Sequence, residues 1–295
     1  MQILSAGILA LRVLTHNIRY AADPPSTGEA PWPQRLPDLL AQFRYHTEYA
    51  PQTFICMQEV LDNQLDDILD GLNQGSDTWA SIGLGRDDGA RAGEYSPILY
   101  QPAIWNLKEF KYYWLSETPD RPSKGWDAGS IRIVTIGVFQ DRQISRDIVA
   151  INTHLDNAGT IAREEGSKLL VNTVNSYVQG TANSTHGPLQ VFLAGDMNSR
   201  EDQEAYGVLT GSGSPLADVK TIVPPGNIYG YNETFTGFTG SGEGRIDYVF
   251  ATQGTEDEWV GNGYATLPNI FEDGSGLYFS DHRAVVADFS LPARS

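Results

Sequence analysis

The sequence feature that most limits the fold is a short apolar run, rich in β-branched residues, with chemically reactive polar residues at or beside one end. Runs of about four to eight such residues predict buried β-strands. Five runs carry polar residues of this kind, and a sixth run is directly preceded by them. The predicted strands span residues 11–18, 54–60, 148–156, 191–198, 246–250 and 284–289. The polar positions are Asn17, Glu59, His154, Asp196, Asn198, Asp247, Asp281 and His282.

So many polar groups beside apolar strands are expected to surround a charged partner, because an unpaired buried carboxylate costs on the order of several kcal/mol. Oxygen donors of the Asp, Glu and Asn type suit Mg²⁺ or Mn²⁺. A zinc site would need more His or a group of Cys, and Cys56 is the only cysteine. We therefore expect one Mg²⁺ or Mn²⁺ ion. The single cysteine also excludes a disulfide framework.

Apolar residues at helical spacing predict three helices between the strands. One spans residues 61–72, a second runs from about 160 to 178, and a third contains 36–43 and is entered through Pro33 or Pro37. Each stripe lies on one face of its helix, so we expect these helices to pack against a sheet.

Residues 211–245 are rich in Gly, Ser, Thr, Asn and Pro and predict a long surface loop. Aromatic residues in it either stack on a sugar or base or hold the loop against the body of the protein; they are Tyr229, Tyr231, Phe235 and Phe238. No repeat, linker or change of composition divides the chain. We expect a single domain, residues 1–295, with its core at about 11–290.

The charge balance bears on the partners of the protein. The chain of 295 residues has 20 Lys and Arg against 37 Asp and Glu, a formal net charge of −17. A protein that holds a long polyanion needs a basic surface, so a small phosphorylated substrate is favoured, with nucleic acid as the alternative. No apolar run reaches the roughly 18 to 20 residues that span a bilayer. We expect a monomer without an integral membrane segment, located in the cytoplasm, with secretion as the alternative.

The polar residues stand in a characteristic order of short motifs. These are THNIRY, MQEV, NTHLD, GDMN, RIDYVF and SDH. The ordered set resembles the endonuclease/exonuclease/phosphatase superfamily of metal-dependent phosphoesterases, which includes deoxyribonuclease-like nucleases, deadenylases and inositol-polyphosphate phosphatases. The resemblance implies an α+β fold, a four-layer αββα sandwich of two packed, mostly antiparallel sheets flanked by helices, with the site at one end of the sheets.

The resemblance also implies a role for each polar residue near the cation. Glu59 holds the ion, with Asn17 and Asp281 in its first or second layer of contacts. In abasic-site nucleases an acidic residue follows two positions after the first-strand Asn, whereas this chain has Arg19 there. The resemblance therefore does not extend to a second metal ion or to a lesion-specific role.

The remaining motif residues are implied to act on the phosphate. Asp196 orients or deprotonates the attacking water, and Asn198 fixes that water or a phosphoryl oxygen. His282 and His154 donate to phosphoryl oxygens. Asp247 hydrogen-bonds the far nitrogen of His282, which fixes its tautomer and favours the charged form.

Further segments resemble a poorly characterised microbial and fungal branch of the superfamily. They are GRDDG, GEYSPILY, WLSETPDRPSKGWDAG and RIVT. They contain four of the residues expected to bind the substrate, Arg86, Lys124, Trp126 and Arg132; Arg163, outside these segments, is the fifth. The leading hypothesis is a Mg²⁺-dependent hydrolase of a small phosphodiester or phosphomonoester, such as a phosphorylated sugar or lipid headgroup. The alternatives are a nuclease, including a deadenylase-like 3′ to 5′ exonuclease, and a non-catalytic binding module of the same fold.

Overall fold

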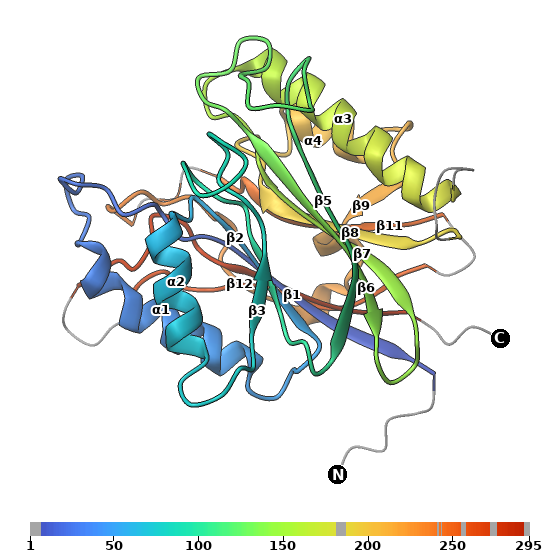
Figure 1. Ribbon diagram of the computed structural model, residues 1–295, viewed down its shortest axis with the longest axis horizontal. Coiled ribbons are helices and arrows are strands. Elements are labelled where there is room, and N and C mark those ends of the chain that lie inside the picture. The colour runs from blue at the N-terminus through green and yellow to red at the C-terminus, as the bar shows by residue number, and fades with distance from the viewer. Residues whose placement is uncertain are drawn as a thin grey trace.

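Two β-sheets pack face to face in the computed structural model, which describes residues 7–180, 187–240, 242, 244–254, 258–271 and 276–291 (Figure 1). In spatial order, the first sheet contains β10 (Ile228–Gly230), β12 (Val260–Thr266), β13 (Val285–Leu291), β1 (Leu9–Asn17), β2 (Thr53–Gln58), β4 (Ile98–Tyr100) and β3 (Ala80–Ile82). The second contains β5 (Trp105–Trp114), β6 (Ile133–Asp141), β7 (Asp147–His154), β8 (Gln190–Asp196), β11 (Asp247–Thr252) and β9 (Leu216–Asp218).

Helices cover the outer face of each sheet (Figure 1). They are α1 (Trp32–Thr47) and α2 (Asp62–Leu72) on the first sheet and α3 (Thr160–Gln179) and α4 (Glu204–Thr210) on the second. The short helix α5 (Val219–Ile222), which a 3₁₀ turn at Pro225–Asn227 follows, instead contributes Val219 to the cluster between the sheets. Leu39 and Phe43 of α1 share a buried cluster with Leu14 and Ile55 of the first sheet. A second cluster joins α3 and α4 to the outer face of the second sheet, and a third lies between the sheets. The protein is thus the expected α+β sandwich with four layers.

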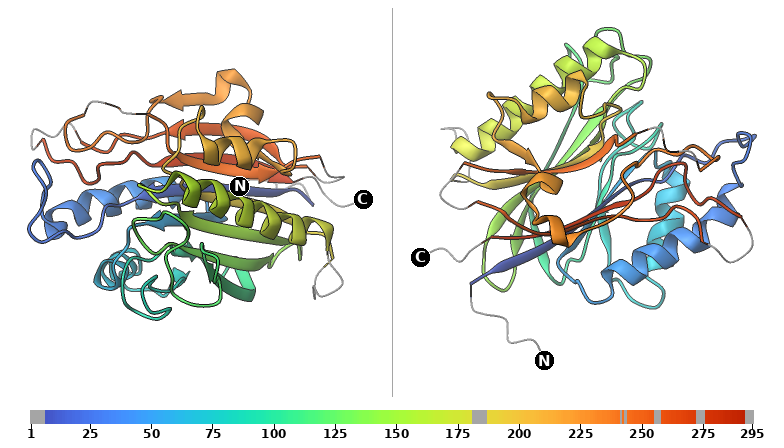
Figure 2. Two further views of the ribbon diagram at one scale, coloured as in Figure 1. Left: turned by 90° about the horizontal axis from the view of Figure 1, so that it is seen from above. Right: turned by 180° about the vertical axis from the view of Figure 1, so that it is seen from behind.

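The strand register brings the predicted site residues to one end of both sheets. β1 and β2 are parallel, with Asn17 opposite Gln58. β7 and β8 are also parallel, with His154 opposite Asp196, while antiparallel β11 places Asp247 opposite Asp196 on the other side. The described chain starts and finishes at the opposite end, where Leu9 pairs with Leu291 (Figure 2).

A buried amide links the two sheets just beneath this end. Asn152 of β7 donates from Nδ2 to the carbonyls of Met57 at 2.8 Å and Pro97 at 2.9 Å. Its Oδ1 accepts from Gln58 Nε2 at 2.8 Å. Nδ2 and Oδ1 of Asn152 therefore both bond to groups of the first sheet or beside it, and these bonds hold the two sheets in one register.

The sequence predicted the three long helices correctly, with one difference. α1 begins at Trp32, so Pro33 lies in its first turn and Pro37 lies inside it. The predicted loop over 211–245 was wrong in part, because it contains β9, α5, the 3₁₀ turn and β10. Leu216–Asp218 pairs with β11 and Ile228–Gly230 pairs with β12. Pairing with a neighbouring strand, rather than local periodicity, stabilises such short elements.

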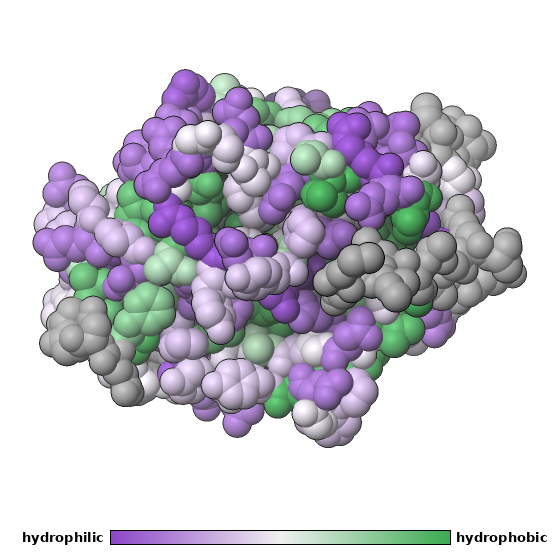
Figure 3. Space-filling model, turned by 90° about the horizontal axis from the view of Figure 1, so that it is seen from below, coloured by the Kyte–Doolittle hydropathy of each residue, from purple (hydrophilic) through white to green (hydrophobic). Residues whose placement is uncertain are grey.

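The surface seen from below in Figure 3 is mostly hydrophilic, with small hydrophobic patches scattered over it. Such a surface agrees with the excess of acidic residues in the chain. Within the described ranges, none of the helices is long and apolar enough to cross a membrane.

Replacing Asn152 with Ala should lower the free energy of unfolding by about 2 to 4 kcal/mol, because two buried carbonyls and a buried amide lose a partner. Asn172→Ala on the exposed face of α3 is the matched control and should change stability by less than about 0.5 kcal/mol. Urea denaturation followed by circular dichroism measures both. Equal stability of the two variants would show that the Asn152 amide does not hold the sheets together.

Candidate active site

One side-chain amide joins carboxylates from the two sheets. Asn17, the last residue of β1, donates from Nδ2 to Glu59 Oε1 at 3.0 Å and to Asp196 Oδ2 at 2.9 Å. Its Oδ1 accepts from the backbone N–H of Arg19 at 3.0 Å. Glu59 directly follows β2 of the first sheet, and Asp196 ends β8 of the second. Asn17 therefore holds two acidic groups side by side that the chain separates by more than a hundred positions.

Backbone strain is concentrated around this amide. Glu59 has φ +59°, Arg19 has φ +61° and Asn198 has φ +46°, all in the left-handed region that residues other than Gly rarely adopt. Each such residue costs roughly 1–3 kcal/mol and persists only where its surroundings fix it, commonly at functional sites. Three of them next to one carboxylate pair mark this end of the sheets as the functional end.

A positive charge lies against the first-sheet side of the cluster. Arg19 Nη1 is 3.7 Å from Glu59 Oε2, and Arg19 Nε donates to Glu29 Oε1 at 3.3 Å. Its guanidinium also stacks 4.3 Å from the ring centroid of Tyr20. Burial, together with the nearby Glu59 charge, raises the pKa of Asp281. Arg19 thus partly balances a group of acidic residues that would otherwise repel one another.

An Asp–His pair faces Asp196 from the other side. His282 Nδ1 donates to Asp247 Oδ2 at 2.9 Å, and His282 Nε2 lies 3.7 Å from Asp196 Oδ2. Burial alone would lower the pKa of His282, but the Asp247 and Asp196 carboxylates outweigh burial and raise it well above its ordinary value. Phe235 packs against the His282 ring with centroids 4.9 Å apart, so this loop aromatic holds the loop against the site. The geometry presents a charged imidazole N–H next to Asp196.

His154 is held in a neutral tautomer by its neighbours. Asn198 Nδ2 donates to the Leu155 carbonyl at 2.9 Å, which fixes the orientation of that amide. Its second hydrogen points at His154 Nε2, also at 2.9 Å, so Nε2 accepts and the ring hydrogen lies on Nδ1. Burial and the charges of Arg132 and Arg86 lower the pKa of His154 well below its ordinary value. In this form Nε2 accepts from Asn198; the donation to a phosphoryl oxygen that the resemblance implied stays a prediction.

Two of the predicted substrate-binding arginines lie beside His154. Arg86 pairs with Glu94 through both terminal nitrogens, at 2.7 and 2.8 Å. Arg132 donates from Nε to Asp156 Oδ2 at 3.2 Å. Both arginines therefore reach the site, each already paired with a carboxylate.

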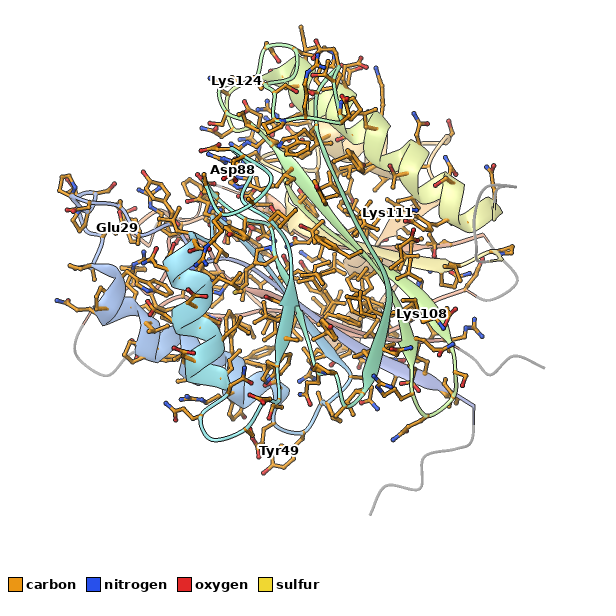
Figure 4. All side chains as sticks on the ribbon, viewed as in Figure 1. Glu29, Tyr49, Asp88, Lys108, Lys111 and Lys124 are labelled. Atoms are coloured by element: carbon orange, nitrogen blue, oxygen red, sulfur yellow. The ribbon has the colours of Figure 1, made fainter. Side chains whose placement is uncertain are left out.

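The other three predicted substrate-binding residues lie away from this cluster of contacts. Arg163 of α3 forms an ion pair with Glu204 and donates to the Asp156 carbonyl. Lys124 is exposed on the loop between β5 and β6 (Figure 4). Trp126 of the same loop is half-buried, and its backbone N–H is bound by Glu117. The structure brings none of the three into contact with the carboxylate cluster.

Three residues that sequence reasoning did not select also build the site. Glu94 pairs with Arg86, Asp156 with Arg132, and Ser280 Oγ donates to the Asn17 carbonyl at 2.6 Å and accepts from the His282 N–H at 3.0 Å. All three lie inside the motif segments quoted above. Their motifs were the available signal, but residue type alone did not distinguish them from ordinary turn residues.

A family model described as the endonuclease/exonuclease/phosphatase family matches residues 14–282. The chain belongs to this family. An endonuclease/exonuclease/phosphatase family protein from Bacteroides thetaiotaomicron is 28% identical over 96% of this chain and 98% of its own, with a TM-score of 0.82. A mannosyl-6-phosphatase from the same organism is 29% identical over 95% of this chain and 99% of its own, with a TM-score of 0.78. A search of curated proteins found no match.

A more distant structure shows how widely the fold is shared. The human nocturnin catalytic domain, solved with a bound sulfate anion, is 17% identical over 96% of this chain and 93% of its own, with a TM-score of 0.69. At this identity the likeness concerns the fold alone. Members of the endonuclease/exonuclease/phosphatase family are phosphoesterases, including phosphatases, nucleases and deadenylases, and generally depend on a divalent metal.

The acidic cluster fits the divalent ion that this family uses. Asp247 Oδ1 and Asp281 Oδ1 are buried and find no hydrogen-bond donor in the described part of the protein. One ligand atom each from Asp196, Asp247 and His282 lie within 4.8 Å of one another, but His282 is charged through its ion pair with Asp247, so only the carboxylates of this group would face an ion. Buried carboxylate oxygens without a donor are costly, and an oxygen-rich set of this kind suits a hard cation.

Asp156 should contribute stability in a pH-dependent way. Burial alone would raise the pKa of Asp156, but the backbone N–H groups of Gly129 and Gly159 and the Arg132 charge lower it to about 2. A carboxyl group whose pKa is lowered on folding stabilises the fold at pH values above its pKa in the unfolded chain, which is about 3.9. This stabilisation is lost as the pH falls through the pKa of the folded state. Asp156→Asn should therefore unfold at lower urea than the unaltered protein at pH 7, and the gap should narrow below about pH 4.

Asp202→Asn, at an exposed carboxylate, is the control for this measurement and should have the same urea midpoint as the unaltered protein at each pH from 7 to 4. If the difference in urea midpoint between Asp156→Asn and the unaltered protein stayed constant down to pH 3, this assignment of pH-dependent stability to Asp156 would be wrong.

Proposed function

We propose that the protein is a Mg²⁺-dependent hydrolase of small phosphate esters, with a phosphorylated sugar or lipid headgroup as the substrate. The observation that carries the proposal is the meeting of Glu59 and Asp196 on one Asn17 amide, with the charged His282 3.7 Å from Asp196. Hydrolysis of a phosphoester requires an oriented water and neutralisation of the phosphoryl oxygens. Carboxylates for the first task and an imidazolium for the second lie within one site.

In this proposal Glu59 and Asp281 hold the ion, and Asn17 keeps the Glu59 carboxylate in place. Asn17 Nδ2 and Oδ1 are both used within the protein, which favours an orienting role for it over direct ligation. Bound Mg²⁺ or Mn²⁺ would neutralise charge on the phosphoryl group. The unpartnered Asp281 Oδ1 supports a role for that carboxylate at the ion.

The groups on the second sheet carry out proton transfer and charge stabilisation. Asp196 accepts a hydrogen bond from the Asn198 backbone N–H at 2.9 Å, so its carboxylate has a fixed orientation toward the attacking water. Asp196 takes the proton of that water. His282 donates Nε2–H to a phosphoryl oxygen, while Asp247 holds Nδ1 and keeps the ring charged. The leaving oxygen takes its proton from solvent water.

Two observations favour a small substrate over nucleic acid. The net charge of −17 opposes contact with a long phosphate backbone. The mannosyl-6-phosphatase from Bacteroides thetaiotaomicron matches nearly the whole chain at 29% identity. Arg86 and Arg132 flank the site and are proposed to contact the substrate. Lys124, Trp126 and Arg163 do not contact the carboxylate cluster, so we do not assign them contacts to the phosphate.

The substitutions Glu59→Gln and Asp196→Asn should each lower kcat for p-nitrophenyl phosphate and bis(p-nitrophenyl) phosphate by about 10² to 10³, since loss of one transition-state contact costs about 2.7–4 kcal/mol. EDTA should abolish the activity of the unaltered protein, and Mg²⁺ or Mn²⁺ should restore it. Glu109→Gln, on the edge strand β5, is the matched control and should keep full activity.

The same assay includes single-stranded RNA and plasmid DNA, with circular dichroism to show that each variant is folded. Near-normal turnover in either site variant would refute the assigned roles. Cleavage of nucleic acid far faster than of both aryl esters would replace the proposal with a nuclease. Lack of hydrolysis of every ester, with and without metal, would favour a binding module of the same fold.

A further inference from the structure

A buried guanidinium beside the site donates all of its hydrogens to main-chain carbonyls. Arg35 of α1 is completely buried, and a guanidinium has five N–H groups to satisfy. Burying such a charge costs on the order of several kcal/mol unless every donor is used. Nε donates to Ala30 at 3.0 Å, Nη1 to Ile18 at 2.7 Å and Phe279 at 3.2 Å, and Nη2 to Arg19 and Tyr20, both at 3.1 Å.

Four of these carbonyls belong to two segments that border the proposed ion site. Three of them are consecutive in the turn that directly follows Asn17, the residue whose amide bonds to Glu59. The fourth, that of Phe279, lies two positions before Asp281, one of the carboxylates proposed to hold the ion. A single guanidinium nitrogen, Nη1, bonds to both segments. Arg35 therefore connects the Glu59 side of the site to the Asp281 side.

Two consecutive peptide groups of the turn carry this restraint into the site. The peptide group between residues 18 and 19 accepts from Arg35 at its oxygen and donates from the Arg19 nitrogen to Asn17 Oδ1 at 3.0 Å. The next peptide group accepts from Arg35 at its oxygen and donates from the Tyr20 nitrogen to Glu59 Oε2 at 3.3 Å. Hydrogen bonds linked in this way polarise and strengthen one another. The guanidinium thus orients the Asn17 amide and the Glu59 carboxylate through the backbone, without direct contact.

The turn needs such a restraint because its central residue is strained. Arg19 has φ +61°, and a residue in this region keeps its conformation only where its surroundings fix it. Its carbonyl accepts from Arg35 and also from Gln64 Nε2 of α2 at 3.1 Å. Glu29, labelled in Figure 4 on the loop before α1, lies 3.6 Å from Arg35 Nη2 and accepts from the Arg19 side chain. Side chains from two helices and one loop therefore hold this turn in place.

The second segment is attached to β1 by further buried hydrogen bonds. Ser280 Oγ donates to the Asn17 carbonyl at 2.6 Å, and His16 Nε2 donates to the His282 carbonyl at 3.1 Å. Asp281 Oδ1 is buried without a donor in the described part of the chain, so its own backbone must place this carboxylate. The bond from Arg35 to the carbonyl that precedes Ser280 fixes the start of this backbone and ties it to the turn.

We propose that Arg35 is a positioning residue for the divalent ion, which fixes the turn after β1 and the segment before Asp281 so that Glu59 and Asp281 bind one ion together. The inference rests on the proposed metal-dependent hydrolase and adds to it a residue that touches neither ion nor substrate. For the fold alone, well-packed apolar residues commonly serve as well as a buried charge. Groups that orient metal ligands, in contrast, typically change metal affinity by about 10- to 100-fold when they are replaced.

The test measures Mn²⁺ binding by calorimetry in Arg35→Lys, which keeps the charge but not the five donors, and in Arg35→Met, which keeps only the length of the side chain. The Kd for Mn²⁺ should rise about 10- to 100-fold in both variants. Arg44→Lys is the matched control on the same helix, because Arg44 donates to the Gly71 carbonyl near the end of α2 that lies away from Glu59. Its Kd should be unchanged.

Hydrolysis of p-nitrophenyl phosphate gives a second readout that a purely structural role would not change. At low Mn²⁺ the kcat of both Arg35 variants should fall in parallel with ion binding. At saturating Mn²⁺ it should largely recover, because the groups proposed to act on the phosphate are intact. Circular dichroism and urea denaturation show whether each variant is folded.

The outcomes separate this inference from the hydrolase proposal. Mn²⁺ binding that depends on Arg35 but not on Arg44, in a protein that hydrolyses no phosphate ester, would support the positioning role and refute the hydrolase. Metal-dependent hydrolysis with the same Kd for Mn²⁺ in the unaltered protein and the folded Arg35 variants would overturn the role and leave the hydrolase standing. An equal rise of Kd in Arg44→Lys, or loss of the fold in both Arg35 variants, would also overturn the role. No Mn²⁺ binding by the unaltered protein would overturn both proposals.

Discussion

The site depends on the side-chain amide of Asn17, which spans the gap between two sheets. Its Nδ2 donates to Glu59 from the first sheet and to Asp196 from the second, and its Oδ1 is fixed by the Arg19 backbone. Two carboxylates that share one amide group repel each other unless a donor or a cation lies between them. The strained backbones of Glu59, Arg19 and Asn198 are held in place by this arrangement. The register of the sheets, fixed below by Asn152, brings the partners together.

Strand ends and loops of this fold carry different parts of the site, which explains how one fold can act on many substrates. The groups proposed to act on the phosphate lie at strand ends, where β pairing fixes their positions. Arg86, which is proposed to contact the substrate, lies on the loop between β3 and β4. Loops tolerate changes of sequence that strands do not. This agrees with a fold that occurs in both a mannosyl-6-phosphatase and the human nocturnin catalytic domain.

The family resemblance implied the four layers, whereas the periodicity of apolar residues located the three long helices and the strands that end in polar residues. Sequence reasoning did not select β5 as a strand, since WNLKEFKYYW mixes charged and aromatic residues at a sheet edge. It could not assign the His154 tautomer, which is set by the Leu155 carbonyl through Asn198. It missed Glu94, whose importance comes from contact with Arg86 and nearness to His154 and not from any local pattern.

The most direct test of the central claim is a crystal structure with bound Mn²⁺, located by its anomalous scattering. The claim is that Glu59 and Asp281, at the end of the first sheet, hold one divalent ion beside Asp196 of the second sheet. It predicts a single strong peak at this end of the sheets, with a Glu59 carboxylate oxygen at about 2.0–2.2 Å, the range for ions of this size. A well-occupied peak elsewhere in the protein, with Glu59 free of metal, would contradict it.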